Sequence, residues 1–405
     1  MTAKSGHSSQ PGLLVQKYGG SSLARPEQIQ AVAARITELH RAGHKLIIVV
    51  SAMGKTTDQL VELAYKVSGT PNRRELDMLL TTGERISMAL MSMALNDCGC
   101  PAISFTGSQA GVFTNELHSN ARIIDMKPIR VEAQLAHGHV AVLAGFQGVS
   151  PTTKEITTLG RGGSDTTAVA MAAYFKAERC EIRKDVDGVH SADPNVIRGT
   201  RHLPELDYHS LLDMTFWGAK VLHYRSVELA TLLEIPLLVG LAHGDGRSTL
   251  IHGETKMYEQ AQILSVNSHK DVRLLEVHKT DLATAFAEVS LVTKSADLPL
   301  PQFLDSEISN GTCRLLLTAP LETLNAITNA SAKFPALKFS SDEISTVTAT
   351  CQGAFASTLP TEAAQALAKH GIPVRKMLFG AMSLTVVVDS RHREKAIQAL
   401  HDLET

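Results

Sequence analysis

The chain has 405 residues, with 39 Lys plus Arg, 41 Asp plus Glu and a formal net charge of −2. This near-neutral balance argues against a general nucleic-acid binder and against a polybasic membrane protein. Hydrophobic residues make up 44% and charged residues 20%, as in globular proteins, and the length suggests two or three domains. Five scattered cysteines, an odd number, argue against a disulfide framework.

No segment is predicted to cross a membrane. The longest aliphatic runs, such as residues 46–50 (LIIVV), are far shorter than the ~20 residues that span a bilayer. Residues 1–12 are small and polar and lack the apolar core of a secretion signal. We therefore expect a flexible amino-terminal tail and a cytoplasmic protein.

From residue 13 to about 255, aliphatic strands alternate with amphipathic helices. LLVQKY is expected to be a strand, and a helix follows that begins at Pro26 and ends at Gly43. KLIIVVSAM is a strand with almost no polar alternation, as expected when both faces of a sheet are covered. Further strands are expected at PAISFTG, HVAVLAGF and IPLLVG. This order predicts an α/β domain with a mostly parallel sheet, whose ligands bind at the carboxyl ends of the strands.

After residue 255 the segments become shorter. Strand, helix, strand, helix and strand are expected at VRLLEV, DLATAFAEVSLV, CRLLLTA, LETLNAITNASAKF and ALKFSS. From Ile344 a second set follows, namely ISTVTATC, TEAAQALAKHG, VRKMLFG, SLTVVVDS and REKAIQALHDL. The order predicts two small α+β, ferredoxin-like units, at 262–342 and 343–405.

Two glycine-rich turns after predicted strands carry the clearest chemical signal. The first is Lys17-Tyr18-Gly19-Gly20-Ser21, in which glycines allow close approach of an anion and a lysine adds charge. The second, LGRGGSDTTA at 159–168, opens a helix, and the amide groups of a helix start bind anions. A third turn, Asp185-Val186-Asp187-Gly188, carries a weaker chemical signal. Walker, protein-kinase, HExxH and GxSxG motifs are absent from the sequence, so a phosphate-handling enzyme must have another fold.

Together these segments resemble the amino acid kinase family and, within it, the aspartokinases. The resemblance covers about residues 13–250 and rests on an ordered set of stretches: VQKYGGSSL, VVSAMGKTTDQL, LLTTGERISMAL, SFTGSQAG, AGFQGV, TTLGRGGSDTTAVA, DVDGVHSADP and GAKVLHYRSVELA. The carboxyl-terminal pair resembles tandem ACT domains. The resemblance implies an αβα sandwich at 13–255, followed by two ACT-like domains.

The implied activity is transfer of the ATP γ-phosphate, with Mg²⁺, to the β-carboxylate of L-aspartate, the entry step to lysine, threonine and methionine synthesis. Because the nucleophile is already ionised, the site needs cations and oriented amides rather than a general base. Lys17 and Asp165 are the implied catalytic residues, with Asp165 positioning Lys17 or a Mg²⁺-bound water. The implied ATP-binding residues are Lys17, Gly19, Gly20, Ser21, Gly163, Ser164, Asp185 and Lys220.

Aspartate needs a cation for its α-carboxylate and an anion for its ammonium group. By resemblance, Arg161 supplies the cation and Glu84 the anion, while Gly162, Ser51 and Thr57 line the substrate. Physically, all of this requires that the two glycine turns fold onto a common spot.

The sequence departs from the family at the nucleotide end. Arg183 and Lys184 replace an aromatic or small hydroxylic residue, and His190 stands where Tyr is usual. Asn195 follows Ala-Asp-Pro, where the family places a phosphate-binding Arg. Nucleotide binding should be weaker unless Arg183, Lys184 or Arg198 reaches the same space. Tyr224 also replaces a frequent Pro.

The ACT-like half departs as well. The first strand–helix connection is His278-Lys279-Thr280-Asp281, without the usual Pro-Gly loop, and the later copy retains only Gly353. We therefore expect a homodimerisation platform in which lysine or threonine feedback is weak or lost.

Two other functions stay open at this point. One is a kinase for another carboxylate, such as glutamate. The other is a catalytically weak sensor of nucleotide and amino acid.

Overall fold

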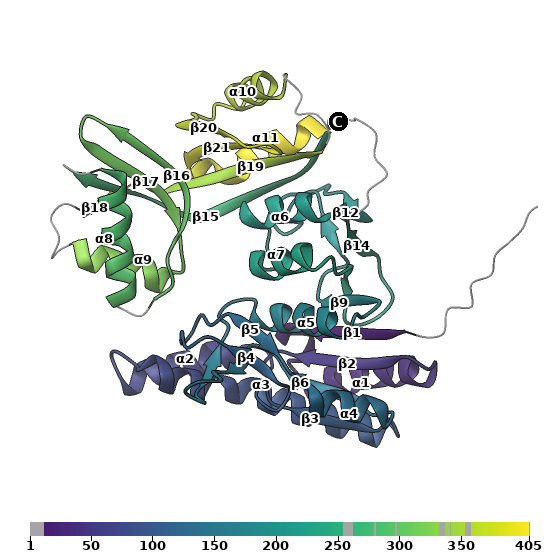
Figure 1. Ribbon diagram of the computed structural model, residues 1–405. Helices are drawn as coiled ribbons and strands as arrows, with labels where there is room; N and C mark the ends of the chain where they lie inside the picture. Colours follow the sequence, from purple (N-terminus) through teal and green to yellow (C-terminus); the bar gives the residue numbers. More distant parts are fainter. Residues whose placement is uncertain are drawn as a thin grey trace, which may run out of the picture. The chain divides into compact units, whose positions relative to one another are not determined.

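The computed structural model describes residues 12–253, 262–278, 281–295, 298–331, 337–340, 342–352 and 358–404. The chain forms two compact units (Figure 1). The first comprises Met1–Val189, Leu203–His209 and Val221–Thr255, and the second comprises His190–His202, Ser210–Lys220 and Lys256–Thr405. Two short segments within the stretch 13–255 thus group with the carboxyl-terminal part. The domain boundaries expected from the sequence remain predictions.

The first unit contains an eight-stranded sheet in the order β12-β14-β13-β9-β1-β2-β6-β3. The strands from β3 to β13 are parallel, and β14 joins antiparallel to β13. The bounds are β1 Leu13–Tyr18, β2 Lys45–Val50, β3 Ala102–Phe105, β6 Val140–Ala144, β9 Arg179–Lys184, β12 Glu205–Asp207, β13 Leu237–Leu241 and β14 Ser248–His252. The strands expected at LLVQKY, KLIIVV, PAISF, VAVLA and PLLVG are confirmed.

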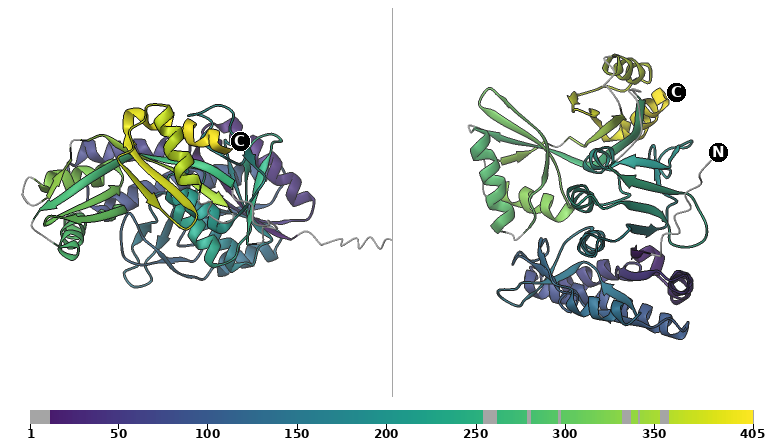
Figure 2. Two further views of the ribbon diagram at one scale, coloured as in Figure 1. Left: turned by 90° about the horizontal axis from the view of Figure 1, so that it is seen from above. Right: turned by 45° about the vertical axis from the view of Figure 1, so that its right-hand side comes forward.

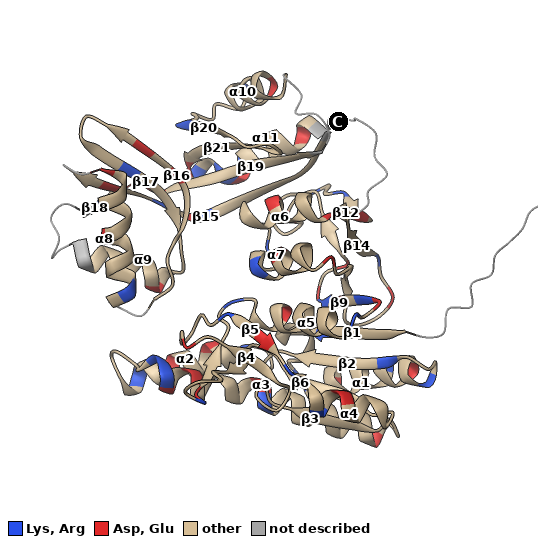
Figure 3. Ribbon diagram, viewed as in Figure 1, with Lys and Arg blue, Asp and Glu red and all other residues tan. Residues whose placement is uncertain are grey.

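Helices cover both faces of this sheet, which gives the expected αβα sandwich. Apolar residues of α1 and α3 pack with those of β1, β2 and β6 on one face, and α5 and α7 lie on the other. α5 is built of small residues and is buried along nearly its whole length, so it packs closely on β1. Figure 3 shows few charged residues along β2 beyond its start, as burial of that strand requires. The helices of this unit are α1 Pro26–Arg41, α2 Thr56–Val67, α3 Arg73–Asp97, α4 Ile129–Ala136, α5 Gly163–Tyr174 and α7 Tyr224–Leu232. α6 Tyr208–Phe216 belongs to the second unit from Ser210 onward.

A four-stranded sheet in the order β5-β4-β7-β8 leads into the second glycine-rich turn. Its strands are β4 Val112–Thr114, β5 Ile123–Met126, β7 Gln147–Val149 and β8 Ile156–Thr158. A short two-stranded sheet joins β10 Val189–His190 to β11 His202–Leu203.

The second unit is built on a seven-stranded antiparallel sheet in the order β16-β17-β15-β19-β21-β20, with β18 also paired to β15. The strands are β15 Gln262–His278, β16 Gln302–Ser309, β17 Thr312–Thr318, β18 Leu337–Phe339, β19 Ile344–Gln352, β20 Lys376–Phe379 and β21 Ser383–Asp389. The helices are α8 Leu282–Ser295, α9 Leu321–Ser331, α10 Leu359–Lys369 and α11 Arg393–His401.

The long strand β15 belongs to two ferredoxin-like halves. Its carboxyl-terminal part pairs with β17 and β18, giving the order β18-β15-β17-β16, and its amino-terminal part pairs with β19, giving β15-β19-β21-β20. An irregularity between His269 and Val272 marks the change of partner. Figure 2 shows this strand from two further sides. The expected pair of ferredoxin-like halves is confirmed, but the sequence missed β16 and the first part of β15.

The segments Ser210–Lys220 and His190–His202 pack within this second unit. On α6, Asp213 accepts hydrogen bonds from Thr350 (2.7 Å) and Ser383 (3.0 Å). The hydroxyl of Ser191 lies 2.8 Å from Nε2 of His401 on α11. These contacts explain why residues that precede the carboxyl-terminal part in sequence group with it in space.

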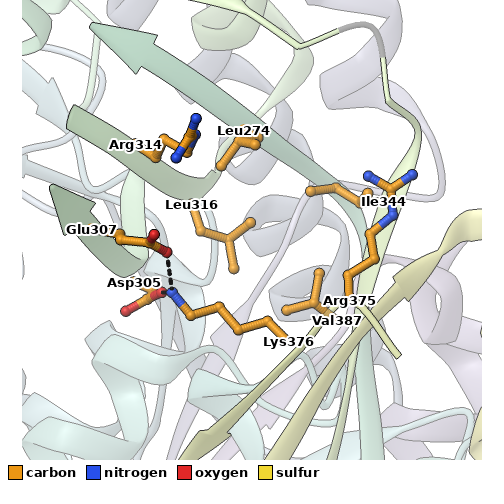
Figure 4. Close-up of a pocket in the computed structure, with 9 residues that line it drawn as sticks. All are labelled: Leu274, Asp305, Glu307, Arg314, Leu316, Ile344, Arg375, Lys376 and Val387. Carbon is orange, nitrogen blue, oxygen red and sulfur yellow. Dashed lines mark hydrogen bonds and ion pairs between the residues drawn. The ribbon is translucent and has the colours of Figure 1, made fainter. Parts of the chain in front are cut away.

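A cavity of about 190 Å³ lies on the sheet of the second unit (Figure 4). Its floor is aliphatic and its rim is charged, and the lining residues are Leu274, Asp305, Glu307, Arg314, Leu316, Ile344, Arg375, Lys376 and Val387. Lys376 on β20 forms ion pairs with Asp305 (2.6 Å) and Glu307 (3.0 Å) on β16. These two strands are at opposite ends of the sheet order, so the sheet must curl strongly for them to meet.

Several expected features fall outside the described residues, namely the amino-terminal tail up to residue 11, residues 279–280 of the first ACT-like connection, and Gly353. Within the described ranges, no helix combines the length and the apolar character that crossing a bilayer requires.

Candidate active site

Lys17 lies near the end of β1, and a turn with two glycines, Gly19 and Gly20, follows it. A Cβ atom on Gly20 would lie 2.5 Å from the carbonyl oxygen of Ala52, so only glycine lets this turn approach the loop after β2 so closely. The amide of Gly54 donates to the carbonyl of Gly20 at 2.9 Å and ties the two loops together. The Lys17 side chain is only 7% exposed, and its ammonium lies close to Gly19.

The turn before α5 takes a shape that needs glycine. Gly160 and Gly162 have φ of +75° and +70°, in the left-handed region. A Cβ atom on Gly162 would lie 2.1 Å from Cβ of His223, so a larger residue there would collide with the imidazole-bearing segment. Gly163 and Ser164 are buried in the first turn of α5, a position that favours an anion, and the amide of Gly163 donates to the carbonyl of Gly160 at 3.0 Å.

The two turns meet at an ion pair. Nζ of Lys17 lies 2.6 Å from Oδ1 of Asp165, and both side chains are almost fully buried. Burial alone would raise the pKa of Asp165, but the charges of Lys17 and Lys184 outweigh it and hold this pKa below its usual range. Asp165 is therefore ionised at neutral pH and fixes the Lys17 ammonium at the junction, which is the common spot that the sequence required.

Glu84 contributes a second buried carboxylate. The amide of Ala52 donates to its Oε1 at 3.1 Å, while its Oε2 is buried and has no hydrogen-bond partner among the described residues. Gly83 lets α3 come this close, because a Cβ atom there would lie 2.8 Å from that of Ala52. Burial raises the pKa of Glu84 to about 7, although the Ala52 amide and Lys17 act in the opposite direction. Among the described residues, Glu84 forms no ion pair.

Ser51 and Thr57 lie on either side in sequence of Ala52 and Thr56, the residues next to Gly83 and Glu84. Ser51 directly follows β2, and its amide donates to the carbonyl of Tyr18 at 3.1 Å. Thr57 lies in the first turn of α2, and both side chains are half-buried. Ser51 thus lies in the loop after β2, and Thr57 lies in the helix that follows this loop.

At the end of β9, the expected nucleotide residues differ in their surroundings. Asp185 is exposed in the turn that follows the strand. Arg183 is 11% exposed and is held by Glu181, with Nη2 2.5 Å from Oε2. Nζ of Lys184 donates to the carbonyl of Val221 at 2.6 Å.

Three other predicted residues are exposed. The side chains of Ser21, Arg161 and Lys220 make no hydrogen bond or ion pair within the described part of the chain, and Lys220 belongs to the second unit. Asn195 is also in the second unit, where its amide and side chain donate to Asp193 at 2.9 and 3.1 Å. The ring of His190 packs edge-on against that of His202, with centroids 5.6 Å apart.

Comparison with known proteins identifies the family. Residues 12–240, more than half of the chain, match the family model described as "Amino acid kinase family". The chain belongs to the amino acid kinase family. It is 41% identical to the aspartokinase of Mycolicibacterium smegmatis, over 96% of this chain and 95% of that protein. It is 37% identical to the aspartokinase of Geobacillus stearothermophilus, over 96% of this chain and 97% of that protein.

The fold agrees with this assignment. The crystal structure of E. coli aspartokinase III in complex with aspartate and ADP matches with a TM-score of 0.80 at 20% identity, covering 96% of this chain and 99% of that one. The structure of aspartate kinase from Synechocystis matches with a TM-score of 0.55 at 34% identity, covering 96% of this chain and 68% of that chain.

In this amino acid kinase, the buried carboxylate of Asp77 supports the second turn, although the sequence did not single it out. It accepts from the hydroxyl and the amide of Thr158 (2.6 and 3.1 Å) and lies 2.8 Å from Nδ1 of His118. The amide of Ser119 donates to the same carboxylate. Because Asp77 lies within a helix and bonds to residues distant in sequence, no local pattern reveals it.

Arg225 and His223 also help to hold the second glycine-rich turn in place. Arg225 donates to the carbonyls of Leu159 (2.6 Å) and Ala121 (2.9 Å) and so clamps the start of the glycine turn. His223 accepts from the amide of Arg225 at 3.3 Å, through Nδ1, as the cap of α7. Both lie in the stretch GAKVLHYRSVELA that carries the family resemblance, so the sequence points to their segment but not to their roles.

Proposed function

We propose that this amino acid kinase is an aspartate kinase, which transfers the γ-phosphate of ATP to the β-carboxylate of L-aspartate to give 4-phospho-L-aspartate. One observation carries the proposal. Two glycine-rich turns meet at the Lys17–Asp165 ion pair, beside the buried and half-satisfied carboxylate of Glu84. The aspartokinases at 37–41% identity over nearly the whole chain support the same reaction. The reaction is the first step of lysine, threonine and methionine biosynthesis.

The chemistry requires little more than positioning and charge. A carboxylate nucleophile is already ionised at neutral pH, so the obstacle is the approach of two anions. Lys17 supplies a fixed positive charge where negative charge develops on the transferring group, and Asp165 holds that ammonium in place. The amide of Gly20 and the hydroxyls of Ser21 and Ser164 would bind phosphate oxygens, and Gly19 and Gly163 would let the phosphates approach the backbone closely.

We assign the substrate's ammonium group to Glu84, whose Oε2 is a buried acceptor without a partner among the described residues. An ammonium group there would provide the cation that this carboxylate lacks. The exposed guanidinium of Arg161 would bind the α-carboxylate in a bidentate manner. Ser51, Thr57 and Gly162 would line the remaining side.

At the nucleotide end, Asp185 would hold the adenosine part, and Lys220 is assigned to the phosphates by resemblance alone. No group of three or more His, Cys, Asp or Glu side chains in the described ranges could form a metal centre. Mg²⁺ commonly binds through substrate phosphates and one or two carboxylates, so we propose that it arrives with ATP. We also propose a cytoplasmic homodimer joined through the ACT-like halves.

A hydroxylamine trap tests the activity directly, because an acyl phosphate reacts to give a hydroxamate. We expect hydroxamate with MgATP and L-aspartate and none with L-glutamate. Hydroxamate from glutamate instead would identify a kinase for another carboxylate. If neither acid gives hydroxamate while ATP still raises the melting temperature, the chain is a sensor and the proposal is wrong.

A further inference from the structure

Helix α3 of the first unit carries two buried carboxylates on one face. Asp77 and Glu84 are 0% and 3% exposed, and residues seven positions apart lie on the same face of a helix. At a rise of 1.5 Å per residue they are separated by about 10 Å along the helix axis. Glu84 contacts the loop after β2 through the amide of Ala52, whereas Asp77 contacts Thr158 at the end of β8. One helix thus touches the surroundings of both glycine-rich turns.

The carboxylate of Asp77 is fully occupied by the protein itself. Its Oδ1 accepts from the hydroxyl of Thr158 at 2.6 Å, and its Oδ2 accepts from the amide of the same residue at 3.1 Å. The amide of Ser119 lies 3.1 Å from both oxygens, and Nδ1 of His118 lies 2.8 Å from Oδ2. Because a carboxylate offers about four acceptor positions, Asp77 has none left for a ligand. Its role is to hold the chain around it.

Asp77 holds Ser119 in a conformation that is unfavourable for a residue with a Cβ atom. Ser119 has φ of +63°, in the left-handed region. The bond from its amide to Asp77 offsets that cost. Strained backbone of this kind persists only where its surroundings fix it, and it is concentrated at functional sites. A weaker grip by Asp77 should therefore let this loop relax.

The strained loop lies directly against the second glycine-rich turn. A Cβ atom on Gly160 would lie 3.0 Å from the carbonyl oxygen of Ser119, and the amide of Ala121 donates to the carbonyl of Thr158 at 2.8 Å. Gly160 precedes Arg161, whose exposed side chain makes no hydrogen bond or ion pair within the described ranges. The placement of the Arg161 guanidinium therefore depends on the backbone of the turn.

We propose that Asp77 is a positioning residue for aspartate binding, which acts by fixing the turn that presents Arg161. The inference rests on the proposed function, in which Glu84 binds the ammonium group of the substrate and Arg161 its α-carboxylate. α3 carries Glu84 directly and supports the turn of Arg161 through Asp77, so this helix sets the separation of the two groups that recognise the substrate. Gly163 and Ser164 are fixed within α5, so ATP binding should depend on Asp77 much less.

The test removes one hydrogen bond of Asp77 and keeps its charge. For Thr158→Val we expect the KM for aspartate to rise about tenfold, as for the loss of a hydrogen bond to a charged group. The KM for ATP and kcat should stay at their native values, because binding lost equally from ground state and transition state changes KM and not kcat. Thr158→Ser keeps the hydroxyl and should keep the native KM for aspartate.

Two further variants complete the design. Thr157→Val is the matched control, since it removes a buried hydroxyl of the same strand that bonds to Thr114 (2.6 Å) instead of Asp77; its KM for aspartate should be native. Asp77→Asn is an independent second variant, because its amide offers one acceptor oxygen instead of two, and it should show the same selective rise in the KM for aspartate.

A merely structural role would give another pattern. Loss of folded enzyme would lower the melting temperature and the apparent kcat of Thr158→Val and Thr157→Val alike, with both KM values native, and that result would overturn the proposal. KM values for aspartate and ATP that rise together would overturn it as well. If the native chain forms hydroxamate from aspartate and Thr158→Val keeps the native KM for aspartate, only this inference is wrong. A native chain that forms no hydroxamate from aspartate would refute the proposed function and this inference together.

Discussion

At the scale of single residues, the Lys17–Asp165 pair should control both turnover and stability. Lys17→Met should lower kcat by at least about 10²–10³-fold, the cost of losing one preorganised charge stabiliser. It also leaves Asp165 buried with its nearest counter-charge removed, which typically costs about 3–5 kcal/mol. Steady-state kinetics and urea unfolding would measure the two effects.

The pH dependence of that stability has a definite sign. In the native chain the pKa of Asp165 is depressed, so its stabilisation is present above the unfolded-state pKa and is lost as pH falls. Without Lys17, burial raises this pKa, and the variant should instead regain stability as the pH is lowered. The control is Lys17→Met with Asp165→Asn, which should be inactive yet more stable at neutral pH than Lys17→Met. Unfolding free energies of the two variants that coincide at every pH would contradict the pairing.

The raised pKa of Glu84 leads us to expect that aspartate binding depends on pH. A pKa near 7 means that the free carboxyl is half protonated at neutral pH, and only the ionised form can bind the ammonium of aspartate. The kcat/KM for aspartate should therefore decrease as pH drops below about 7. Glu84→Gln should remove this dependence and raise the KM for aspartate about tenfold to a hundredfold.

The KM for ATP provides the internal control for Glu84, because it should be the same in Glu84→Gln and in the native chain. Initial rates between pH 5.5 and 8.5, in identical buffers, would measure both constants. An unchanged pH profile in Glu84→Gln would exclude Glu84 as the titrating group.

A site residue could be predicted from the sequence when it stands in a recognisable local motif, and not when its role depends on contacts with distant residues. Lys17 stands near the end of β1, next to a turn with two glycines. The second turn combines Arg, Gly, Ser and Asp, which is more than a turn requires, so both segments could be found from the sequence. Glu84 required the family context, because an acidic residue in a helix is ordinary. Asp77 could not be found, because its hydrogen-bond partners are residues at least 41 positions away.

At the scale of elements, ion pairs of partly exposed lysines are usually weak, and the pairs of Lys376 are of interest for the strands that they connect. Lys376 joins β20 to β16, the two ends of the sheet order, around the cavity of the second unit. Because these groups are 24–47% exposed, each pair should contribute no more than about 1 kcal/mol. Lys376→Met should thus lower the unfolding free energy only slightly.

The sharper readout for Lys376→Met is hydrogen exchange, which should accelerate at both β16 and β20 while kcat stays unchanged. Lys369→Met, at the end of α10, is the control and should leave both strands unaffected. Faster exchange at β20 alone would show that the bridge does not hold the two edges together.

The strands of the fold were predictable to different degrees. β2 and β6 are aliphatic because both faces of the sheet are covered, and such runs are easily found. β16 escaped prediction because it is an edge strand with the polar sequence QFLDSEIS, in which no apolar alternation is visible. The first part of β15 was missed because its SVNSHK segment carries polar residues, although Ser265 and Val266 are buried.

At the scale of the whole molecule, the proposed assembly and regulation can be tested together. We expect a homodimer by light scattering after size-exclusion chromatography. We also expect millimolar lysine or threonine to leave hydroxamate formation nearly unchanged, because the first strand–helix connection lacks the Pro-Gly loop of ligand-binding ACT domains. Strong inhibition by lysine alone would contradict that expectation, and a monomer would contradict the platform role.

The division into two units could not be predicted from a linear scan. Ser210–Lys220 lies within the stretch that matches the amino acid kinase family, yet Asp213 bonds to β19 and β21 of the carboxyl-terminal sheet. Contacts of this kind depend on side chains more than a hundred positions apart, and no local periodicity encodes them.

Because β15 is shared by both halves, it determines how the carboxyl-terminal part unfolds. If residues 343–404 were expressed by themselves, their half-sheet would lack its fourth strand, and β19 would present an open edge to other chains. Losing the middle of β15 would strip partners from both halves at once. The pair should therefore melt in a single cooperative transition, with neither half surviving as an independent folding unit.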